Sequence, residues 1–206
     1  MEKRLLILSS AYYPPVQYFA EILQAEKLLI EQHETYPKQT YRNRCYIYSA
    51  NGPIPLSIPV ERGSFHKVKL KDVKIDNSRK WQREHINAIE SAYKSSAFFE
   101  FYADTVVRPL YKGSYEYLLD LNMEIMEIML GILELDISVN KTHSFKKEYG
   151  DNSRDLRYSL SPKIKSTYSN PEYYQVFSPV HGFKSNLSII DLLFNMGPET
   201  WPCLRT

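Results

Sequence analysis

The stretch LLILSSAYYPPVQYFAEILQAEKLLI, residues 5–30, decides the fold class of this chain. It opens with a continuous apolar run at residues 5–8, which is typical of a strand buried on both faces. Two prolines then stand where a helix can begin, and apolar residues recur at helical spacing over residues 16–23. A second apolar run follows at residues 28–30. This order predicts a βαβ unit with two parallel strands and a right-handed crossover.

The segment CYIYSANGPIPLSIPV, residues 45–60, predicts a β-hairpin. Its two strand-like runs flank Asn51-Gly52, the pair best suited to a tight turn with positive φ. Three prolines place the second strand at a sheet edge, because proline cannot donate a ladder hydrogen bond. The run VKLKDVKID, residues 68–76, is a candidate for a further strand whose lysines face solvent.

The middle of the chain is predicted to be helical, in segments 78–96, 97–111 and 114–133, and Ser78 is the expected cap of the first. Residues 139–172 lose this periodicity and indicate a long irregular loop. A short helix then bears Ile189, Ile190, Leu192, Leu193 and Phe194, capped by Asn186 or Ser188 and ended by Gly197. We therefore expect one α/β domain over residues 1–206. It has an N-terminal β-α-β unit and a β-hairpin forming a mixed sheet, a helical middle and a short C-terminal helix.

Composition excludes several classes of function. The 26 Lys and Arg nearly balance the 24 Asp and Glu, which argues against general nucleic-acid binding. Two cysteines give neither a disulfide framework nor a metal-binding spacing, so we expect no metal and a reducing cytoplasm. The apolar run near the N-terminus is too short for a signal sequence or for membrane insertion. Nothing in the sequence indicates a cofactor, and the oligomeric state cannot be read from it.

The stretch QTYRNRCYI, residues 39–47, concentrates polar side chains that packing does not require. Gln39, Arg42, Asn43 and Arg44 supply two guanidinium groups and two carboxamides within six positions. Planar forks of this kind suit phosphate, carboxylate or sugar hydroxyl groups. The alternative is a polar strand edge that leads into the hairpin.

Several polar blocks resemble those of the WbqC-like protein family, whose members are often encoded among genes for O-antigen and other surface polysaccharides. The resemblance extends nearly end to end and implies an α/β-type domain with a role in cell-surface glycan biosynthesis, but no established catalytic residue. The chain departs from the family at Gln17 and Tyr41, where members often have Gly and Trp. The blocks are YYPPVQYFAEIL at 12–23, QTYRNRCYI at 39–47, NGPIPLSIPV at 51–60, WQREHINAIESAY at 81–93, DLNMEI at 120–125, DLRYSLSPK at 155–163 and NLSIIDLLFNMG at 186–197.

The turn after the first strand is a candidate ligand site. Open α/β sheets bind ligands outside the carboxyl ends of their strands and at helix N-termini. Tyr13 and Gln17 stand there, and the phosphates of a sugar nucleotide would rest on the helix start. No Gly-rich or HxGH signature accompanies them, so this hypothesis depends on fold analogy.

His33 and Asp191 are the candidate catalytic residues. His33 follows the second strand, where it is placed to act as a general base oriented by Glu31 or Glu34. Its alternative is an exposed or capping histidine. Asp191 stands among Ile and Leu, so it requires a partner if it is buried, and Arg42 or Arg44 is the expected one. Its alternative is a place on the wet face of its helix.

Three further residues complete the candidate substrate site. Trp81 and His85 lie one helical turn apart and either stack on a sugar ring or pack in the core with Tyr93. Asn186 precedes the C-terminal helix and is placed to bind substrate.

From these residues we predict a cytosolic protein of surface-polysaccharide biosynthesis that transfers an acyl or aminoacyl group onto a nucleotide-linked sugar. Its substrate is then a sugar nucleotide or another small anionic molecule. The alternative is a non-catalytic binding or assembly module of the same pathway.

Overall fold

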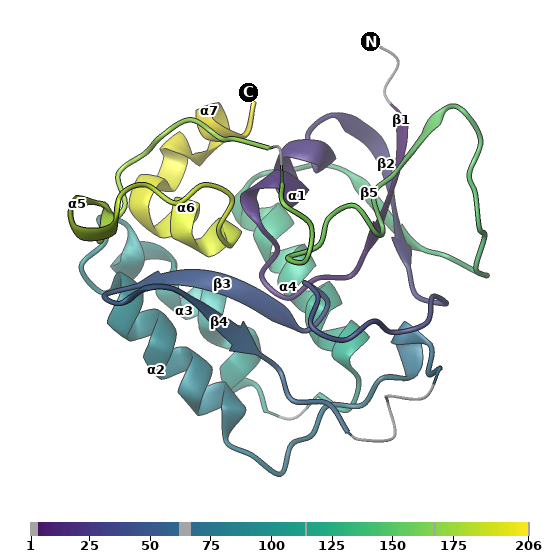
Figure 1. Ribbon diagram of the computed structural model, residues 1–206, viewed down its shortest axis with the longest axis horizontal. Helices are drawn as coiled ribbons and strands as arrows, with labels where there is room; N and C mark the ends of the chain where they lie inside the picture. The colour runs from purple at the N-terminus through teal and green to yellow at the C-terminus, as the bar shows by residue number, and fades with distance from the viewer. Residues whose placement is uncertain (1–3, 62–66, 114, 167, 206) are drawn as a thin grey trace.

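A four-stranded parallel sheet lies at one side of the molecule (Figure 1). The computed structural model describes residues 4–61, 67–113, 115–166 and 168–205. The strand order is β5-β2-β1-β6, and each neighbouring pair is parallel. Helix α1, which spans Val16–Ile22, connects the two central strands, so the predicted βαβ unit is confirmed. The strands are β1 at Arg4–Ser9, β2 at Ala25–Glu31, β5 at Ser138–Lys141 and β6 at Ser153–Asp155.

The hydrophobic run of β1 is buried, as its sequence predicts. Leu6, Ile7 and Leu8 are at most 1% exposed, because β1 has a neighbour on each side and other elements cover both faces of the sheet. Side chains of α1 are almost all buried as well. The β1–α1–β2 segment is therefore the core of this half of the molecule.

The hairpin forms a two-stranded sheet of its own, with β3 at Arg44–Ser49 and β4 at Gly52–Ser57. Gly52 has a φ of 95°, a conformation that glycine adopts without steric cost. Pro53 and Pro55 are exposed and stand opposite tyrosines of β3. Strand β4 pairs with β3 alone, so proline costs it no ladder bond on the free side.

The predicted helical middle is confirmed by α2 at Trp81–Tyr93, α3 at Phe99–Tyr111 and α4 at Leu118–Ile132. Helix α2 packs against β3 of the hairpin and against α3, and α4 contacts α3 (Figure 1). The C-terminal helix α6 spans Ile189–Met196 and contacts both α1 and β3, which joins the two halves. Two short helices are α5 at Ser178–His181 and α7 at Thr200–Leu204.

Three local predictions are wrong. Residues 68–76 form no continuous strand, because Leu70–Asp72 make a 3₁₀ turn. Ser78 does not cap α2, which begins three residues later, and its hydroxyl binds Asp76 instead. The long loop expected at 139–172 holds most of β5 and all of β6. These strands are short and polar, so their pairing with β2 and β1 defines them rather than hydrophobic alternation.

Within the described ranges, no helix is long and apolar enough to cross a membrane.

Candidate functional site

The carboxyl ends of the four parallel strands meet at one edge of the sheet. Strand β1 ends at Ser9, β2 ends at Glu31 and β6 ends at Asp155, while Thr142 follows β5. Open α/β sheets bind their ligands outside this edge. We call these four residues and the side chains that contact them the carboxyl edge.

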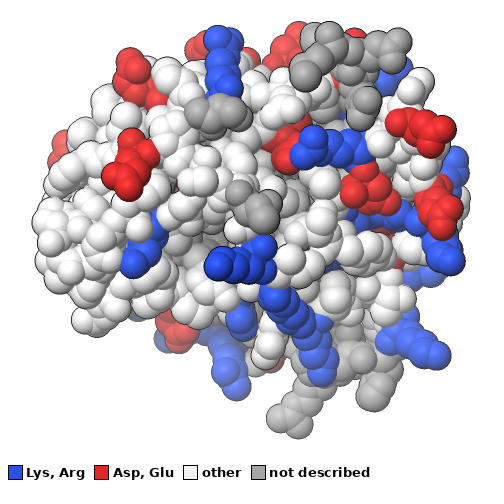
Figure 2. Space-filling view, turned by 45° about the horizontal axis from the view of Figure 1, so that its top comes forward, with Lys and Arg blue, Asp and Glu red and all other residues white. Residues whose placement is uncertain are grey.

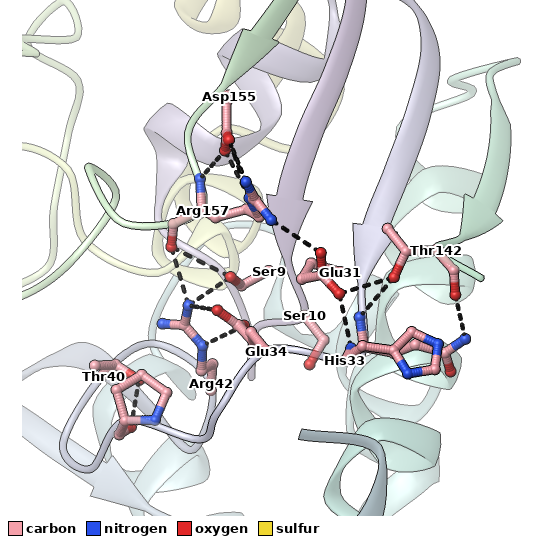
Figure 3. Close-up of polar contacts among 12 residues, drawn as sticks. Ser9, Ser10, Glu31, His33, Glu34, Thr40, Arg42, Thr142, Asp155 and Arg157 are labelled. Carbon is pink, nitrogen blue, oxygen red and sulfur yellow. Dashed lines mark hydrogen bonds and ion pairs between the residues drawn. The ribbon is translucent and has the colours of Figure 1, made fainter. Parts of the chain in front are cut away.

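One half of the carboxyl edge is a buried ion pair between Arg42 and Glu34. The Nε and Nη2 atoms of Arg42 each donate to a carboxylate oxygen of Glu34 at 2.7 Å. Nη2 also donates to the Ser9 hydroxyl and to the carbonyl of Arg157 (Figure 3). The side chains are 3% and 0% exposed, so this two-point contact is removed from water.

The other half is built on Arg157, which is also buried. Its guanidinium makes a two-point contact with Asp155 and donates through Nη1 to Glu31 at 2.9 Å. The second oxygen of Glu31 accepts from the Thr142 hydroxyl at 2.8 Å and from the backbone N–H of His33 at 2.7 Å. Figure 3 shows the two halves joined at the Arg157 carbonyl.

These contacts pair every charged group of the edge and leave one negative charge in excess. Glu31, Glu34 and Asp155 face two guanidinium groups, and every carboxylate oxygen among them accepts at least one hydrogen bond. Arg42 therefore directs most of its donors at protein atoms. The expected ion pair between Arg42 or Arg44 and Asp191 is wrong, because Arg42 pairs with Glu34.

Aromatic rings surround the outer side of the Arg157 guanidinium. The carbon at its centre lies 5.2 Å from the ring centroid of Phe145 and 5.1 Å from that of Tyr149. Tyr158 contacts both guanidinium groups, at 5.7 Å from Arg157 and 5.9 Å from Arg42. Phe145 and Tyr158 are exposed. Both are therefore available for stacking with a ligand at this edge.

His33 and Arg44 are the sequence-predicted site residues that remain partly open to solvent beside this network. The backbone of His33 is held by Glu31, but in the part of the chain that the structure describes its ring makes no hydrogen bond to Glu31 or Glu34. Figure 3 places His33 on the side of Thr142 rather than of Arg42. Arg44 donates through Nε to the Ser57 hydroxyl at 2.8 Å.

Arg42 and Arg44 both lie close enough to Tyr36 for their charges to act on its hydroxyl group. Burial raises the pKa of Tyr36 to about 12, and the positive charges of Arg42 and Arg44 oppose this rise. Both charges therefore lie within electrostatic range of one hydroxyl group. Gln39 is exposed with a φ of 57°, while Asn43 is buried and donates to the carbonyl of Ile58.

Gln17 and Asn186 bind each other. The side-chain oxygen of Asn186 accepts from the backbone N–H of Gln17 at 2.9 Å, which satisfies a donor in the first turn of α1. Its amide nitrogen donates to the Gln17 side chain, which also accepts from Ser166. Asn186 therefore caps α1 rather than α6, which it precedes in sequence. Tyr13 is fully buried and donates to the carbonyl of Val106.

Trp81 and His85 lie in the core. His85 accepts or donates a hydrogen bond with the Tyr12 hydroxyl at 2.8 Å, and its ring packs edge-on against Trp81. Burial lowers the pKa of His85 to about 4, so the ring is neutral at physiological pH. This arrangement is the packing alternative that the sequence left open.

Asp191 is fully buried, so the alternative place on a solvent-exposed helix face is wrong. Its carboxylate accepts hydrogen bonds from the hydroxyls of Tyr93 and Tyr173 and from the amide of Gln175, at 2.6–2.9 Å. Burial raises its pKa from 3.8 to about 6. These three neutral donors tie the segment before α6 to α2, which gives Asp191 a structural task.

Sequence reasoning missed Arg157, Asp155 and Thr142. Asp155 and Arg157 belong to the block DLRYSLSPK, whose family resemblance was the one signal that pointed to them. Among the described residues, no three His, Cys, Asp or Glu side chains come close enough together to hold a metal ion.

Comparisons with known proteins place this chain among relatives whose activity is not described. The model of the WbqC-like protein family matches residues 9–167, which include most of the carboxyl edge. The uncharacterized protein Rv1507c of Mycobacterium tuberculosis is 26% identical over 230 residues, and the match covers 98% of each chain. No solved structure matches at a significant level.

Proposed function

This chain belongs to the WbqC-like protein family, and from that premise we propose that it acts in the cytosol in cell-surface polysaccharide biosynthesis. It binds a nucleotide-linked sugar at the carboxyl edge and transfers an acyl or aminoacyl group to it. The single observation that supports this assignment is the convergence of four parallel strand ends on a polar network. Such an edge is where open α/β sheets bind small molecules.

His33 is the general base of this proposal. Its ring is half-buried while its backbone is fixed by Glu31, so its position is defined without a hydrogen bond to either carboxylate. The amino group of the sugar attacks the carbonyl carbon of an activated ester or thioester. His33 accepts the proton that the amine loses, and the alcohol or thiol of the donor leaves.

Arg44 is the proposed contact for the substrate phosphates. It is half-buried, and its Nε atom donates to Ser57, while its two terminal nitrogens make no hydrogen bond to any residue that the structure describes and can contact a ligand. Arg42 contributes mainly by holding the edge rigid, because two of its three nitrogens already donate to the protein.

A thermal-shift screen against sugar nucleotides, acyl-coenzyme A and amino acids tests the proposal, because a ligand that binds only the native state raises the melting temperature. Arg44→Ala should remove the shift that a sugar nucleotide produces. Arg83→Ala is the matched control, since Arg83 is exposed on α2. If the shift survives Arg44→Ala undiminished, the phosphate site is elsewhere.

Catalysis by His33 has its own test. With a donor and acceptor found in the screen, His33→Ala should lower turnover about 100-fold or more while leaving sugar-nucleotide binding intact. His181→Ala is the control, because that ring contacts the carbonyl of Ala50 in a different part of the molecule. Unchanged turnover in His33→Ala would remove the base assignment.

The second candidate function is a non-catalytic assembly module, and an exposed uncharged surface favours it. Residues 169–183 carry one acidic residue and no Lys or Arg, and they expose Tyr174 and Val180. Figure 2 shows a broad uncharged area on the side where Figure 1 places α5. A chain that binds no small molecule in the screen but co-purifies with a transferase of the pathway would have this function.

A further inference from the structure

An open groove lies between helices α3 and α4, and it shares no lining residue with the carboxyl edge. Its volume is about 740 Å³. Residues 112–117 connect the two helices, and a connection this short makes neighbouring helices run in opposite directions. At one end of the groove, Lys112 forms an ion pair with Glu124 at 2.9 Å. We call this feature the α3–α4 groove.

The two walls of the α3–α4 groove carry opposite charges. Arg108 and Lys112 line it from the α3 side, whereas Asp120, Glu124 and Glu127 line it from α4. Lys112 and Glu124 already bind each other. Arg108, Asp120 and Glu127 are exposed, and none of them forms an ion pair with a residue that the structure describes. These three charges are therefore available to a second surface.

The other end of the groove combines an exposed ring with a notch. Gly131 is exposed between Ile128 and Ile132, and a Cβ atom added to it would meet no atom within 4 Å. Glycine is less stable than alanine inside a helix, so packing within one chain gives no reason for it. Phe101 lies one turn before Thr105 on the same face of α3. It is 76% exposed, the most of any large hydrophobic residue in the described part of the chain.

A second copy of this chain fits these features, because each copy carries both of the complementary walls. Most homodimers have a two-fold axis, which brings the same patch of both copies together. An axis along the groove lays α3 of each copy over α4 of the other, so that basic side chains face acidic ones. An axis across the groove lays α3 over α3 and α4 over α4, and the like charges then repel. The charges therefore select the axis along the groove.

We propose that this chain forms a symmetric homodimer through the α3–α4 groove, with the two-fold axis along it. Arg108 lies one turn before Lys112, and Glu127 lies one turn after Glu124, so on opposed helices the two lie at the same level. Arg108 of each copy therefore pairs with Glu127 of the other. The Phe101 ring of each copy enters the notch at Gly131 of the other.

Analytical ultracentrifugation of the full chain at micromolar concentrations tests this proposal, and the wild type should sediment as a dimer. Arg108→Glu and Glu127→Arg should each raise the dissociation constant at least about 100-fold, because each substitution creates two like-charge contacts in a symmetric dimer. Arg83→Glu and Glu90→Arg are the matched controls, since they make the same charge changes at exposed positions of α2. Both controls should remain dimeric.

Mixing the two charge variants tests the direction of the axis. Arg108→Glu makes both contact positions acidic, and Glu127→Arg makes both basic, so a mixed dimer has opposite charges at each contact. An equimolar mixture should therefore dimerise at a concentration where each variant alone is monomeric. A chain that carries both substitutions should dimerise by itself.

Filling the notch tests the apolar end of the groove. Gly131→Gln puts a good helix former at an exposed helical position, so the helical content by circular dichroism should stay the same or rise. The added side chain takes the place of the Phe101 ring of the other copy, so the dissociation constant should rise at least about tenfold. Ser91→Gln is the control, because Ser91 is exposed on α2 and lies outside the groove.

Three results would overturn the proposal. The first is a wild type that is monomeric at micromolar concentrations. The second is a dimer that survives both Arg108→Glu and Glu127→Arg, since its interface then lies on another surface. The third is a mixture of these two variants that stays monomeric while circular dichroism shows both to be folded, because the two-fold axis then does not lie along the groove.

Discussion

Replacing Arg42 by alanine should destabilise the protein strongly. The substitution leaves Glu34 fully buried, with both carboxylate oxygens deprived of the donors that they contact at 2.7 Å. Breaking a buried ion pair by removing one partner costs about 3–5 kcal/mol. The Ser9 hydroxyl and the Arg157 carbonyl lose a donor as well, which places the expected cost at the upper end of that range.

Urea unfolding followed by circular dichroism measures this cost, and thermal unfolding gives a second reading. For a chain of this size each kcal/mol lowers the melting temperature by about 2–4 °C, so Arg42→Ala should lower it by about 6–20 °C. Lys112→Ala is the control, because it breaks an ion pair with Glu124 whose lysine is 62% exposed. That exposed pair should cost at most about 1 kcal/mol.

A double substitution separates the ion pair from other effects of residue 42. Arg42→Met together with Glu34→Leu replaces the pair by apolar side chains, so no buried charge is left alone. Such replacements are often neutral or stabilising, and the double variant should regain most of the loss. A cost below 1 kcal/mol for Arg42→Ala, or a double variant that is no more stable than the sum of the single losses, would refute the reasoning.

Three further predictions concern the core. Burial raises the pKa of Asp191 to about 6, so its native state binds more protons than the unfolded chain between about pH 4 and 6, and stability falls as pH rises through that window. The free energy of unfolding should fall by an amount on the order of 3 kcal/mol between pH 4 and pH 8. Urea unfolding at these two pH values measures this fall, and Asp191→Asn should reduce it. The same fall in Asp191→Asn as in the wild type would contradict the prediction. Gly197→Ala should cost about 1–3 kcal/mol in thermal unfolding, because Gly197 has a φ of 52° and a Cβ there would collide with the Phe98 ring. The buried Cys45 thiol, whose pKa burial raises, should react with a thiol reagent only after unfolding, and rapid labelling of the native chain would show that it is accessible.

The N-terminal half of the sheet could be predicted because its sequence signals agree with its tertiary environment. The run Leu5–Leu8 is apolar throughout, and the structure buries Leu6, Ile7 and Leu8. Gly52 stands where the hairpin requires positive φ. Strands β5 and β6 carry no such signal, because SVNK and SRD are polar and short. Their strand conformation comes from pairing with β2 and β1, which local sequence does not encode.

The candidate site likewise contains residues that the sequence could predict and residues that it could not. His33 was found because it follows an apolar run, and the end of a buried strand is visible in sequence. Arg157 was missed because it lies 126 residues from Glu31 along the chain, within a segment that lacks periodicity. The expected partner of Asp191 was wrong for a related reason. Its donors are tyrosine hydroxyls and an amide, which sequence cannot distinguish from ordinary core or loop residues.

The charge count at the carboxyl edge changes which residues can recognise a substrate. Two arginines within a polar stretch suggested an anion site. However, the charge of Arg42 is already neutralised by its ion pair with Glu34. A ligand therefore gains little from the charge of Arg42. In the proposed function, phosphate recognition then depends on Arg44, whose Nε donates to Ser57 rather than to a carboxylate. Arg44→Ala should therefore weaken the binding of all sugar nucleotides alike, whatever sugar they carry.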